Sequence, residues 1–171
     1  KHYMLKEIYE QPEAIQQTIS QALNGNALRD DFLKNAEIDF TNIQQVQILA
    51  CGTSYHAGMI AKYWLEQLID LPCQVEIASE FRYRSPVIVA NTLYLCISQS
   101  GETADTLAAL RDTQKRATAK NLSISTMTIC NVATSSMVRE TNHHLLTLAG
   151  PEIGVASTKA FTTQLAALML L

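Results

Sequence analysis

Short runs of apolar residues recur along the chain and predict five strands; Leu93–Ile97 is nearly continuous, whereas in Gln74–Ala78 polar and apolar residues alternate. Four are clear, at Val46–Ala50, Gln74–Ala78, Leu93–Ile97 and Ile124–Cys130, and His144–Leu148 is a weaker fifth. Apolar runs with few polar interruptions are typical of strands that are covered on both faces. The pattern therefore favours a sheet between two layers of helices.

Between these strands the apolar residues change to helical spacing. One helix has its apolar face from Ala57 to Leu68, a second runs from Ala104 to about Ala117, and Ser135–Glu140 is a short third. Alternating strands and helices predict a parallel sheet, and right-handed crossovers leave few topologies. We expect an α/β fold with three αβα layers and a five-stranded, flavodoxin-like sheet in the order 2-1-3-4-5.

The N-terminal segment predicts one more helix, which lies outside the sheet. Pro12 suits the first turn of that helix, and Asn24-Gly25-Asn26 is a plausible stop. Asn35–Asn42 is polar and predicts a connection. We therefore expect a single domain over residues 1–171, in which a helix and connection (1–42) precede the αβα core (43–171).

Composition and charge exclude some classes of partner. The 171 residues are 47% hydrophobic, enough to build a core, and the net charge is −3 with no basic stripe. Neither nucleic acid nor an anionic membrane is expected as a partner. The apolar stretch Leu165–Leu171 falls far short of the ~20 residues of a membrane span. It has the pattern of an unfinished helix, and the first residue is not Met, so we expect a fragment of a larger chain.

The cysteines and histidines show no pattern of a site. The four cysteines form no C-x-x-C pair and lie in or beside apolar runs. They predict reduced, buried thiols and a cytoplasmic protein. The four histidines lack the spacing of metal ligands, so we expect no metal and no other cofactor.

Two loops carry the residues that suit an anion. In this strand order, ligands bind at the carboxyl ends of the strands, between the first and third strands. Cys51–Tyr55 follows the first strand and Ser98–Thr103 follows the third. Each loop opens a helix, whose free N–H groups and positive dipole end attract an anion, while glycine permits close approach and hydroxyls donate. The sequence predicts a phosphate site here.

The alternative is ordinary helix capping, because Ser and Thr are common at helix starts. Two such loops at one crevice favour binding over capping. We expect Glu102, whose charge would repel an anion, to point away or to cap the helix that this loop opens. A third segment, Glu152–Lys159, opens the last helix, where Ser157 or Thr158 is a candidate cap; its density of small residues hints at more than a connection.

Together these motifs resemble the sugar isomerase (SIS) family. The residues that carry the resemblance are Tyr3–Pro12, Cys51–Tyr55, Glu76–Arg84, Ser98–Thr106 and Glu152–Thr162. They span nearly the whole chain and are long and specific. The resemblance is closest to members that join an N-terminal glutaminase domain to two SIS subdomains and convert fructose-6-phosphate and ammonia into glucosamine-6-phosphate.

The resemblance implies that this chain is the first SIS subdomain of such an aminotransferase and ketose–aldose isomerase. Its partners would be a sugar phosphate, the second SIS subdomain and glutaminase domain of the same chain, and a second copy in a homodimer. The family's catalytic lysine, glutamate and histidine have no matching position here, so we expect no catalytic residue and an inactive fragment. The implied substrate ligands are Gly52, Thr53, Ser54, Ser98, Gln99, Ser100, Thr103, Val155 and Ser157.

Two other functions stay open at this point. The first is a sugar-phosphate-sensing SIS module of a transcriptional regulator, which flanking sequence would identify. The second is a stand-alone phosphosugar isomerase, which would need its own acid–base pair in the cleft. The long match over Glu152–Thr162 favours the aminotransferase.

Overall fold

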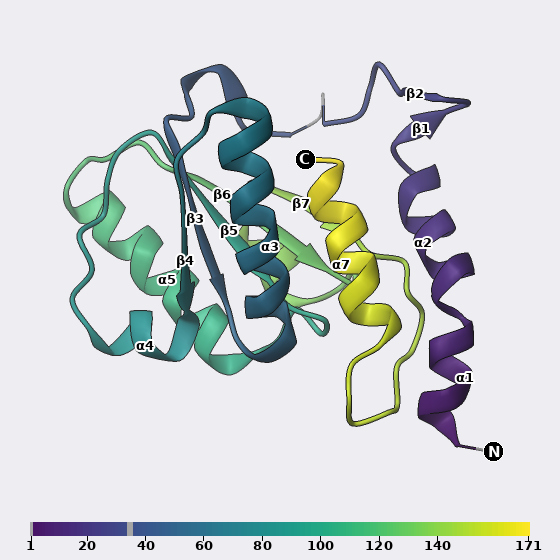
Figure 1. The fold of residues 1–171 in the computed structure, drawn as a ribbon. Coiled ribbons are helices and arrows are strands. Elements are labelled where there is room, and N and C mark those ends of the chain that lie inside the picture. Colours follow the sequence, from purple (N-terminus) through teal and green to yellow (C-terminus); the bar gives the residue numbers. More distant parts are fainter. Residues whose placement is uncertain (1, 34–35) are drawn as a thin grey trace.

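A five-stranded parallel sheet forms the centre of the protein, whose computed structural model describes residues 2–33 and 36–171 (Figure 1). The strand order β4-β3-β5-β6-β7 is the predicted 2-1-3-4-5. Each expected strand is present within two residues of its predicted ends. The strands are β3 (Gln45–Ala50), β4 (Cys73–Ile77), β5 (Thr92–Ile97), β6 (Ser125–Cys130) and β7 (His143–Leu146).

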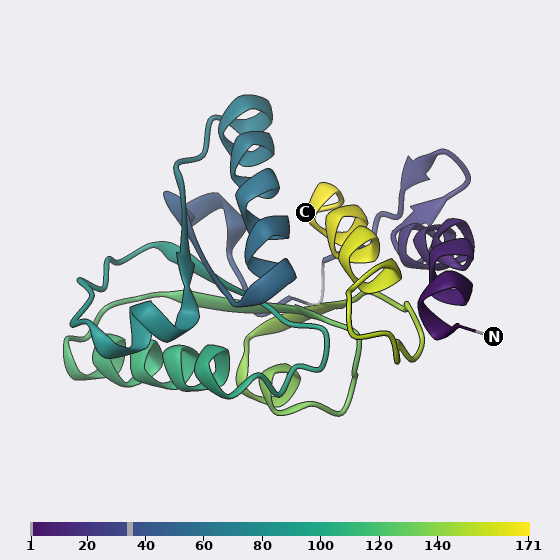
Figure 2. The same ribbon diagram turned by 60° about the horizontal axis from the view of Figure 1, so that its bottom comes forward.

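Helices cover both faces of the sheet, which confirms the three-layer αβα architecture (Figure 2). On one face lie α3 (Gly52–Ile69) and α7 (Lys159–Met169). The opposite face is covered by α4 (Ala78–Tyr83), α5 (Ala104–Ala119) and α6 (Ser136–Glu140).

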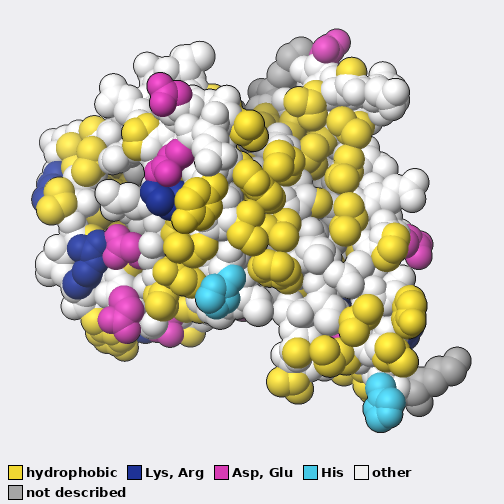
Figure 3. Space-filling view, viewed as in Figure 1, with side chains coloured by type: hydrophobic (Ala, Val, Ile, Leu, Met, Phe, Trp, Pro, Cys, Tyr) yellow, Lys and Arg dark blue, Asp and Glu magenta, His cyan; other side chains and the backbone are white. Residues whose placement is uncertain are grey.

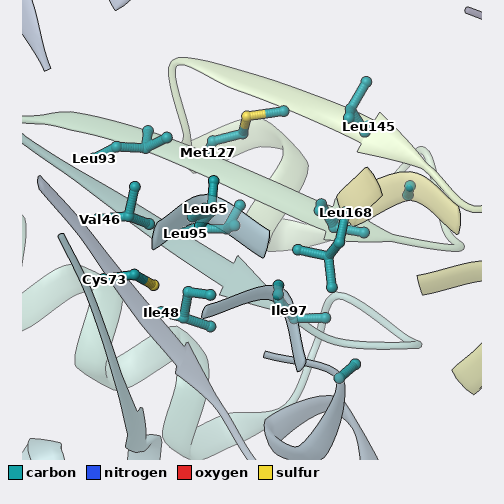
Figure 4. Close-up of a cluster of buried hydrophobic side chains, with 14 of the residues drawn as sticks. Val46, Ile48, Leu65, Cys73, Leu93, Leu95, Ile97, Met127, Leu145 and Leu168 are labelled. Atoms are coloured by element: carbon teal, nitrogen blue, oxygen red, sulfur yellow. The ribbon is translucent and has the colours of Figure 1, made fainter. Parts of the chain in front are cut away.

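Successive side chains of the central strands enter two separate cores. Ile48, Leu95 and Met127 stand side by side in register and are fully buried beneath α3 and α7 (Figure 4). Leu49 and Cys96 point to the other face and pack against α4 and α5. Alternate residues of a strand face opposite ways, so a strand that is apolar at every position needs a cover on both sides.

The N-terminal region contains more structure than the sequence predicted. There are two helices, α1 (Tyr3–Tyr9) and α2 (Gln11–Ser20), instead of one. Pro12 explains the break, because proline has no N–H to donate to the Ile8 carbonyl and its ring crowds that group. The Gln11 side chain donates to the Ile8 carbonyl instead, at 3.0 Å.

The predicted stop at Asn24-Gly25-Asn26 is the tip of a small antiparallel hairpin, β1 (Leu23–Asn24) and β2 (Ala27–Leu28). Gly25 has φ +63°, which suits this turn. The expected connection from Asn35 to Asn42 starts outside the described residues, and its end forms a 3-10 helix, η1 (Phe40–Asn42).

α2 packs beside α7, and its C-terminal end reaches the end of β7 (Figure 1). Gln21 donates to the Leu146 carbonyl at 2.6 Å, and the Thr18 hydroxyl donates to the Thr147 carbonyl. Side chains thus satisfy carbonyls at the exposed end of the edge strand. The N-terminal helices are therefore attached at the edge of the sheet where the fifth strand ends.

Sequence reasoning missed α4, because this helix follows β4 directly and its first residue was assigned to the strand. Ala78 was expected to end the second strand, but that strand ends at Ile77. Ala78 and Phe81 pack into the core beside α5, while Arg82 and Arg84 lie on the outer side. The packing of Ala78 and Phe81 in the core, rather than a sequence signal, determines this helix.

Candidate functional site

The two predicted loops lie beside each other at the carboxyl edge of the sheet. β3 and β5 are neighbours, and their register pairs Ala50 with Ile97, so Cys51 and Ser98 leave the sheet at the same level. The Thr106 hydroxyl, in the first turn of α5, lies 3.9 Å from the Cys51 sulfur and joins the two loops. The structure therefore brings both loops to the switch point of the sheet.

The loop from Ser98 to Thr103 is folded on its own hydroxyl groups. Ser98 Oγ accepts from the Gly101 N–H at 3.0 Å and lies 2.8 Å from Thr103 Oγ1. Ser100 Oγ accepts from the Glu102 N–H at 3.1 Å. Gly101, with φ +66°, has the left-handed conformation that closes this turn. These internal bonds fix the shape of the loop.

These bonds separate the roles of the hydroxyl groups. Ser98 is only 2% exposed, and its oxygen is engaged with Gly101 and Thr103, so it acts inside the loop. Ser100 accepts through its oxygen and keeps its own proton for another acceptor. Ser98 and Thr103 share one hydrogen bond, which uses the hydroxyl proton of one of them. The hydroxyl proton of the other can be donated to a ligand. The loop thus presents two hydroxyl donors.

Backbone donors add to the hydroxyls. Neither α3 nor α5 has a side-chain capping bond at its N-terminus. The first N–H groups of each helix have no partner within the helix and carry the positive end of its dipole. Gly52 and Thr53, in the first turn of α3, are exposed, whereas Ser54 is buried. The hydroxyls of these loops are therefore not caps of the helices that they precede.

The acidic side chains around the loop are occupied by other groups. Glu102 turns away and accepts from the Ser136 N–H of α6 at 2.5 Å, which confirms the expectation that it points away. This bond holds the pKa of Glu102 below its usual value. Asp105, in the first turn of α5, pairs with Arg82 at 3.0 Å. Neither carboxylate is left to oppose an anion at the helix N-terminus.

The third segment is organised by the carboxylate of Glu152. Its oxygens accept from Ser157 Oγ at 3.1 Å, from Thr158 N–H and Oγ1 at 2.8 and 3.1 Å, and from the Ala160 N–H at 3.1 Å. The expectation that Ser157 or Thr158 caps α7 is therefore wrong, because Glu152 takes that place. Val155 lies fully exposed in the same segment.

Asn131 links the Ser98–Thr103 loop to Ala149 and Gly150, just before the third segment, and was missed by sequence reasoning. It follows β6 directly, and its N–H donates to the Gln99 carbonyl at 3.0 Å. Its side chain donates to the Gly150 carbonyl at 2.7 Å and accepts from the Ala149 N–H at 2.7 Å. The sequence signal that could have identified Asn131 is its position directly after the buried strand β6.

An open groove lies between these loops and α2. It is lined on the sheet side by Gln99, Asn131 and Glu152 and on the helix side by Glu13 and Gln16. Of the predicted ligands, Gln99 faces this groove. Gly52, Thr53, Ser54, Ser98, Ser100 and Thr103 gather at the neighbouring β3–β5 crevice. Val155 and Ser157 belong to the third segment, and Ser157 donates to Glu152, which lines the groove.

The thiols lack the features of a reactive site. All four cysteines are free; Cys73, Cys96 and Cys130 are buried as expected, whereas Cys51 is half-buried. Burial raises the pKa of Cys73 and of Cys96 to about 12. Within residues 2–33 and 36–171, no group of three or more His, Cys, Asp or Glu side chains could hold a metal ion. In the same part of the chain, no helix is both long and apolar enough to span a membrane.

Comparison with known proteins identifies the class. The SIS domain family matches residues 39–171, which is most of the chain. The chain therefore belongs to the SIS domain family, as its motifs predicted.

Two relatives that match the whole chain carry the same enzyme name. The chain is 90% identical over its whole length to glutamine–fructose-6-phosphate aminotransferase (isomerizing) of Acinetobacter baylyi and 60% identical to that of Pseudomonas aeruginosa. It spans 28% and 27% of those proteins, respectively.

Solved structures agree. The chain is similar to the C-terminal domain of glucosamine-fructose-6-phosphate aminotransferase from Francisella tularensis, with a TM-score of 0.89 and 54% identity, over 99% of this chain and 46% of that one. Tagatose-6-phosphate ketose/aldose isomerase from Escherichia coli, at 18% identity and a TM-score of 0.78 over 97% and 46% of the two chains, shares the fold.

Proposed function

We propose that this chain is the first SIS subdomain of a glutamine–fructose-6-phosphate aminotransferase and that it holds the phosphate of fructose-6-phosphate. The full-length enzyme makes glucosamine-6-phosphate for amino-sugar biosynthesis in the cytoplasm. Residues 1–171 form one domain, in which residues 1–42 dock beside the αβα core of residues 43–171. The names of relatives up to 90% identical favour this function over a sensor or a stand-alone isomerase.

One observation carries the proposal. Two uncapped helix N-termini open side by side at the ends of β3 and β5, and a preformed loop of hydroxyl groups lies between them. A phosphate needs several donors around a small volume. Thr53, Ser100 and Thr103, with the first N–H groups of α5, would donate to its oxygens, while Ser98 would hold the loop in shape.

The sugar would extend from this cradle toward the third segment. Gln99 and Asn131 connect the cradle to the groove beside Glu152. In this arrangement, the backbone of Val155 and the region of Ser157 contact the sugar, and Gln99 contacts its phosphate or a hydroxyl group. The chain binds and orients the substrate, and the groups that make and break bonds belong to the rest of the enzyme.

A titration of the 171-residue chain tests the binding step. Fructose-6-phosphate should bind weakly and with measurable heat, whereas fructose should give none, because the cradle recognises the phosphate. Equal behaviour of the two sugars would refute the phosphate site. Formation of glucosamine-6-phosphate by the chain alone would refute the claim that its catalytic groups lie elsewhere.

An exposed apolar surface on α3 and α7 suits contact with other parts of the enzyme. Tyr63, Leu68 and Ile69 on α3 and Met169 on α7 are more than half exposed, and Figure 3 shows apolar side chains gathered over these two helices. Exposed apolar patches of this kind mark interaction surfaces. We propose that the second SIS subdomain, the glutaminase domain or the second copy of a homodimer covers them. A matched pair of variants, Leu68→Ser on the patch and Thr118→Ser on α5, would weaken assembly only in the first case.

A further inference from the structure

The carboxylate of Glu7 is buried against the third segment, although Glu7 lies about 146 residues away in sequence. Its side chain belongs to α1, and the residue is 3% exposed. Oε1 accepts from the Ile153 N–H at 2.6 Å and from the Gly154 N–H at 3.2 Å, and Oε2 accepts from the Gly154 N–H at 3.0 Å. A buried carboxylate that binds backbone N–H groups fixes the position of that backbone.

The contact with Glu7 leaves no room for a side chain at position 154. A Cβ at position 154 would lie 2.5 Å from Glu7 Oε2 and 3.4 Å from the Met4 Cα. No side chain fits there unless the carboxylate or α1 moves. The glycine and the glutamate therefore depend on each other.

The segment is held at both of its ends. Glu7 holds Ile153 and Gly154, and Glu152 holds Ser157 and Thr158. Between these anchors Val155 is fully exposed. A short, exposed stretch between two fixed points keeps its backbone groups in one place, which reduces the entropy lost when a ligand binds.

Nearby charges reinforce the attachment of α1. Lys159, the first residue of α7, is 5% exposed and pairs with Glu10 at 2.7 Å. Glu10 also pairs with Lys6 at 3.3 Å. The end of α1 is thus tied to the start of α7, and the segment from 152 to 158 lies between them.

We infer that Glu7 is a positioning residue for the sugar phosphate: it holds the backbone around Val155 in the geometry that the bound sugar requires. The inference rests on the proposed function, in which this backbone contacts the sugar. It adds a residue that lies outside the stretch 39–171 matched by the SIS domain family. The N-terminal helix is therefore part of the substrate site, because the site keeps its shape only while α1 is docked.

The test uses the full-length enzyme and the variant Glu7→Gln, which keeps the size of the side chain. The amide retains one acceptor oxygen but turns an NH2 group toward the Gly154 N–H, so the segment must shift. Contacts to bound substrate that persist in the transition state affect KM more than kcat. We expect the KM for fructose-6-phosphate to rise about tenfold, with kcat within about twofold of the wild-type value.

Glu37→Gln is the matched control. Glu37 is exposed and lies beside Asn91 and Ser123, at the amino edge of the sheet. The same chemical change there should leave both constants unchanged. An unchanged KM in Glu7→Gln, or a fall in kcat alone, would overturn the inference, since loss of folded enzyme lowers kcat without raising KM.

Gly154→Ala provides a second variant if Glu7→Gln does not fold. Its Cβ would displace the carboxylate, so KM should rise in the same way with Glu7 intact, and a wild-type KM would overturn the inference. Failure of the proposed function would be distinguished from failure of this inference, because the wild-type enzyme itself would then not turn over fructose-6-phosphate. Hydrogen exchange at Ile153 and Gly154 should also speed up in both variants and stay unchanged in Glu37→Gln.

Discussion

Gly101 lies directly against Ser135, which begins the turn into α6: a Cβ at position 101 would come 2.5 Å from the Ser135 Cβ and closer still to its hydroxyl oxygen. Gly101 also has φ +66°. Its carbonyl accepts from the Met137 N–H at 3.2 Å. The Ser98–Thr103 loop is thus packed onto α6 at its tightest point, and two separate constraints require glycine there.

Gly101→Ala should therefore both destabilise the fold and disable the cradle. We expect a loss of about 2 to 4 kcal/mol in the free energy of unfolding, from backbone strain and overpacking together. Gly25→Ala is the control, because Gly25 has φ +63° but nothing within 4 Å of a Cβ. It should cost about 1 kcal/mol from strain alone and leave fructose-6-phosphate binding unchanged. Equal losses in the two variants, measured by denaturant unfolding, would contradict the packing argument.

Ser98 and Ser100 should separate stability from binding. Ser98→Ala leaves the Gly101 N–H without its acceptor in a buried place, so we expect a loss of about 1 to 3 kcal/mol in unfolding free energy. Ser100→Ala removes a free hydroxyl proton and the acceptor of the Glu102 N–H, but that N–H is exposed and water can replace the lost acceptor, so stability should change little. Its affinity for fructose-6-phosphate should fall about tenfold, by titration calorimetry. The division of roles is wrong if Ser100→Ala unfolds more easily than Ser98→Ala.

Glu102 predicts a pH dependence of stability. The N–H and hydroxyl of Ser136 lower the pKa of Glu102 in the folded state below its usual value of 4.5. Its contribution is therefore present above pH 4.5 and is lost as the pH falls through the lowered, folded-state pKa. Glu102→Gln should flatten the fall in melting temperature over this acidic range.

Glu13→Gln is the control for this measurement. Glu13 lies on the exposed side of α2 and accepts from Gln17 on the same helix. Its replacement should leave the pH profile of the melting temperature as in the wild type. A Glu102→Gln profile that also matches the wild type would show that the bond to Ser136 does not contribute.

Lys159 should behave as a structural lysine. Its ammonium group is bound to Glu10, and that pairing is the first cause of the lowered pKa of Glu10. Borohydride reduction of the full-length enzyme with fructose-6-phosphate should leave Lys159 unmodified, as judged by peptide mass. Lys159→Met should lower the melting temperature, whereas Lys115→Met, on an exposed face of α5, should not. A reduced sugar adduct on Lys159 would assign it to catalysis instead.

The central architecture could be predicted because it depends on local patterns. Runs such as Leu93–Ile97 are apolar at every position, which only a doubly covered strand requires. Once five strands alternate with helices, the handedness of crossovers leaves few orders, and the observed one is among them. The Cys51–Tyr55 and Ser98–Thr103 loops then had to meet, because neighbouring parallel strands end at the same edge.

Elements without a local signal could not be predicted. α4 has six residues, and its start at Ala78 depends on packing against α5. The break between α1 and α2 depends on Pro12, which cannot donate to the Ile8 carbonyl, and on the Gln11 side chain, which donates to it instead. In each case, a few competing contacts decide the outcome, and a single sequence does not show which of them wins.

The sequence by itself determined the sheet, its order and the hydroxyl-rich composition of the Ser98–Thr103 loop, since burial and backbone freedom act on neighbouring residues. Only the tertiary structure decided that Ser98 faces inward while Ser100 does not. It also decided that Glu152 replaces the expected hydroxyl caps and that Glu7 reaches Gly154 across most of the chain. Such long-range bonds form because buried N–H groups must find acceptors, and the nearest acceptor in space is set by the packing of helices on the finished sheet.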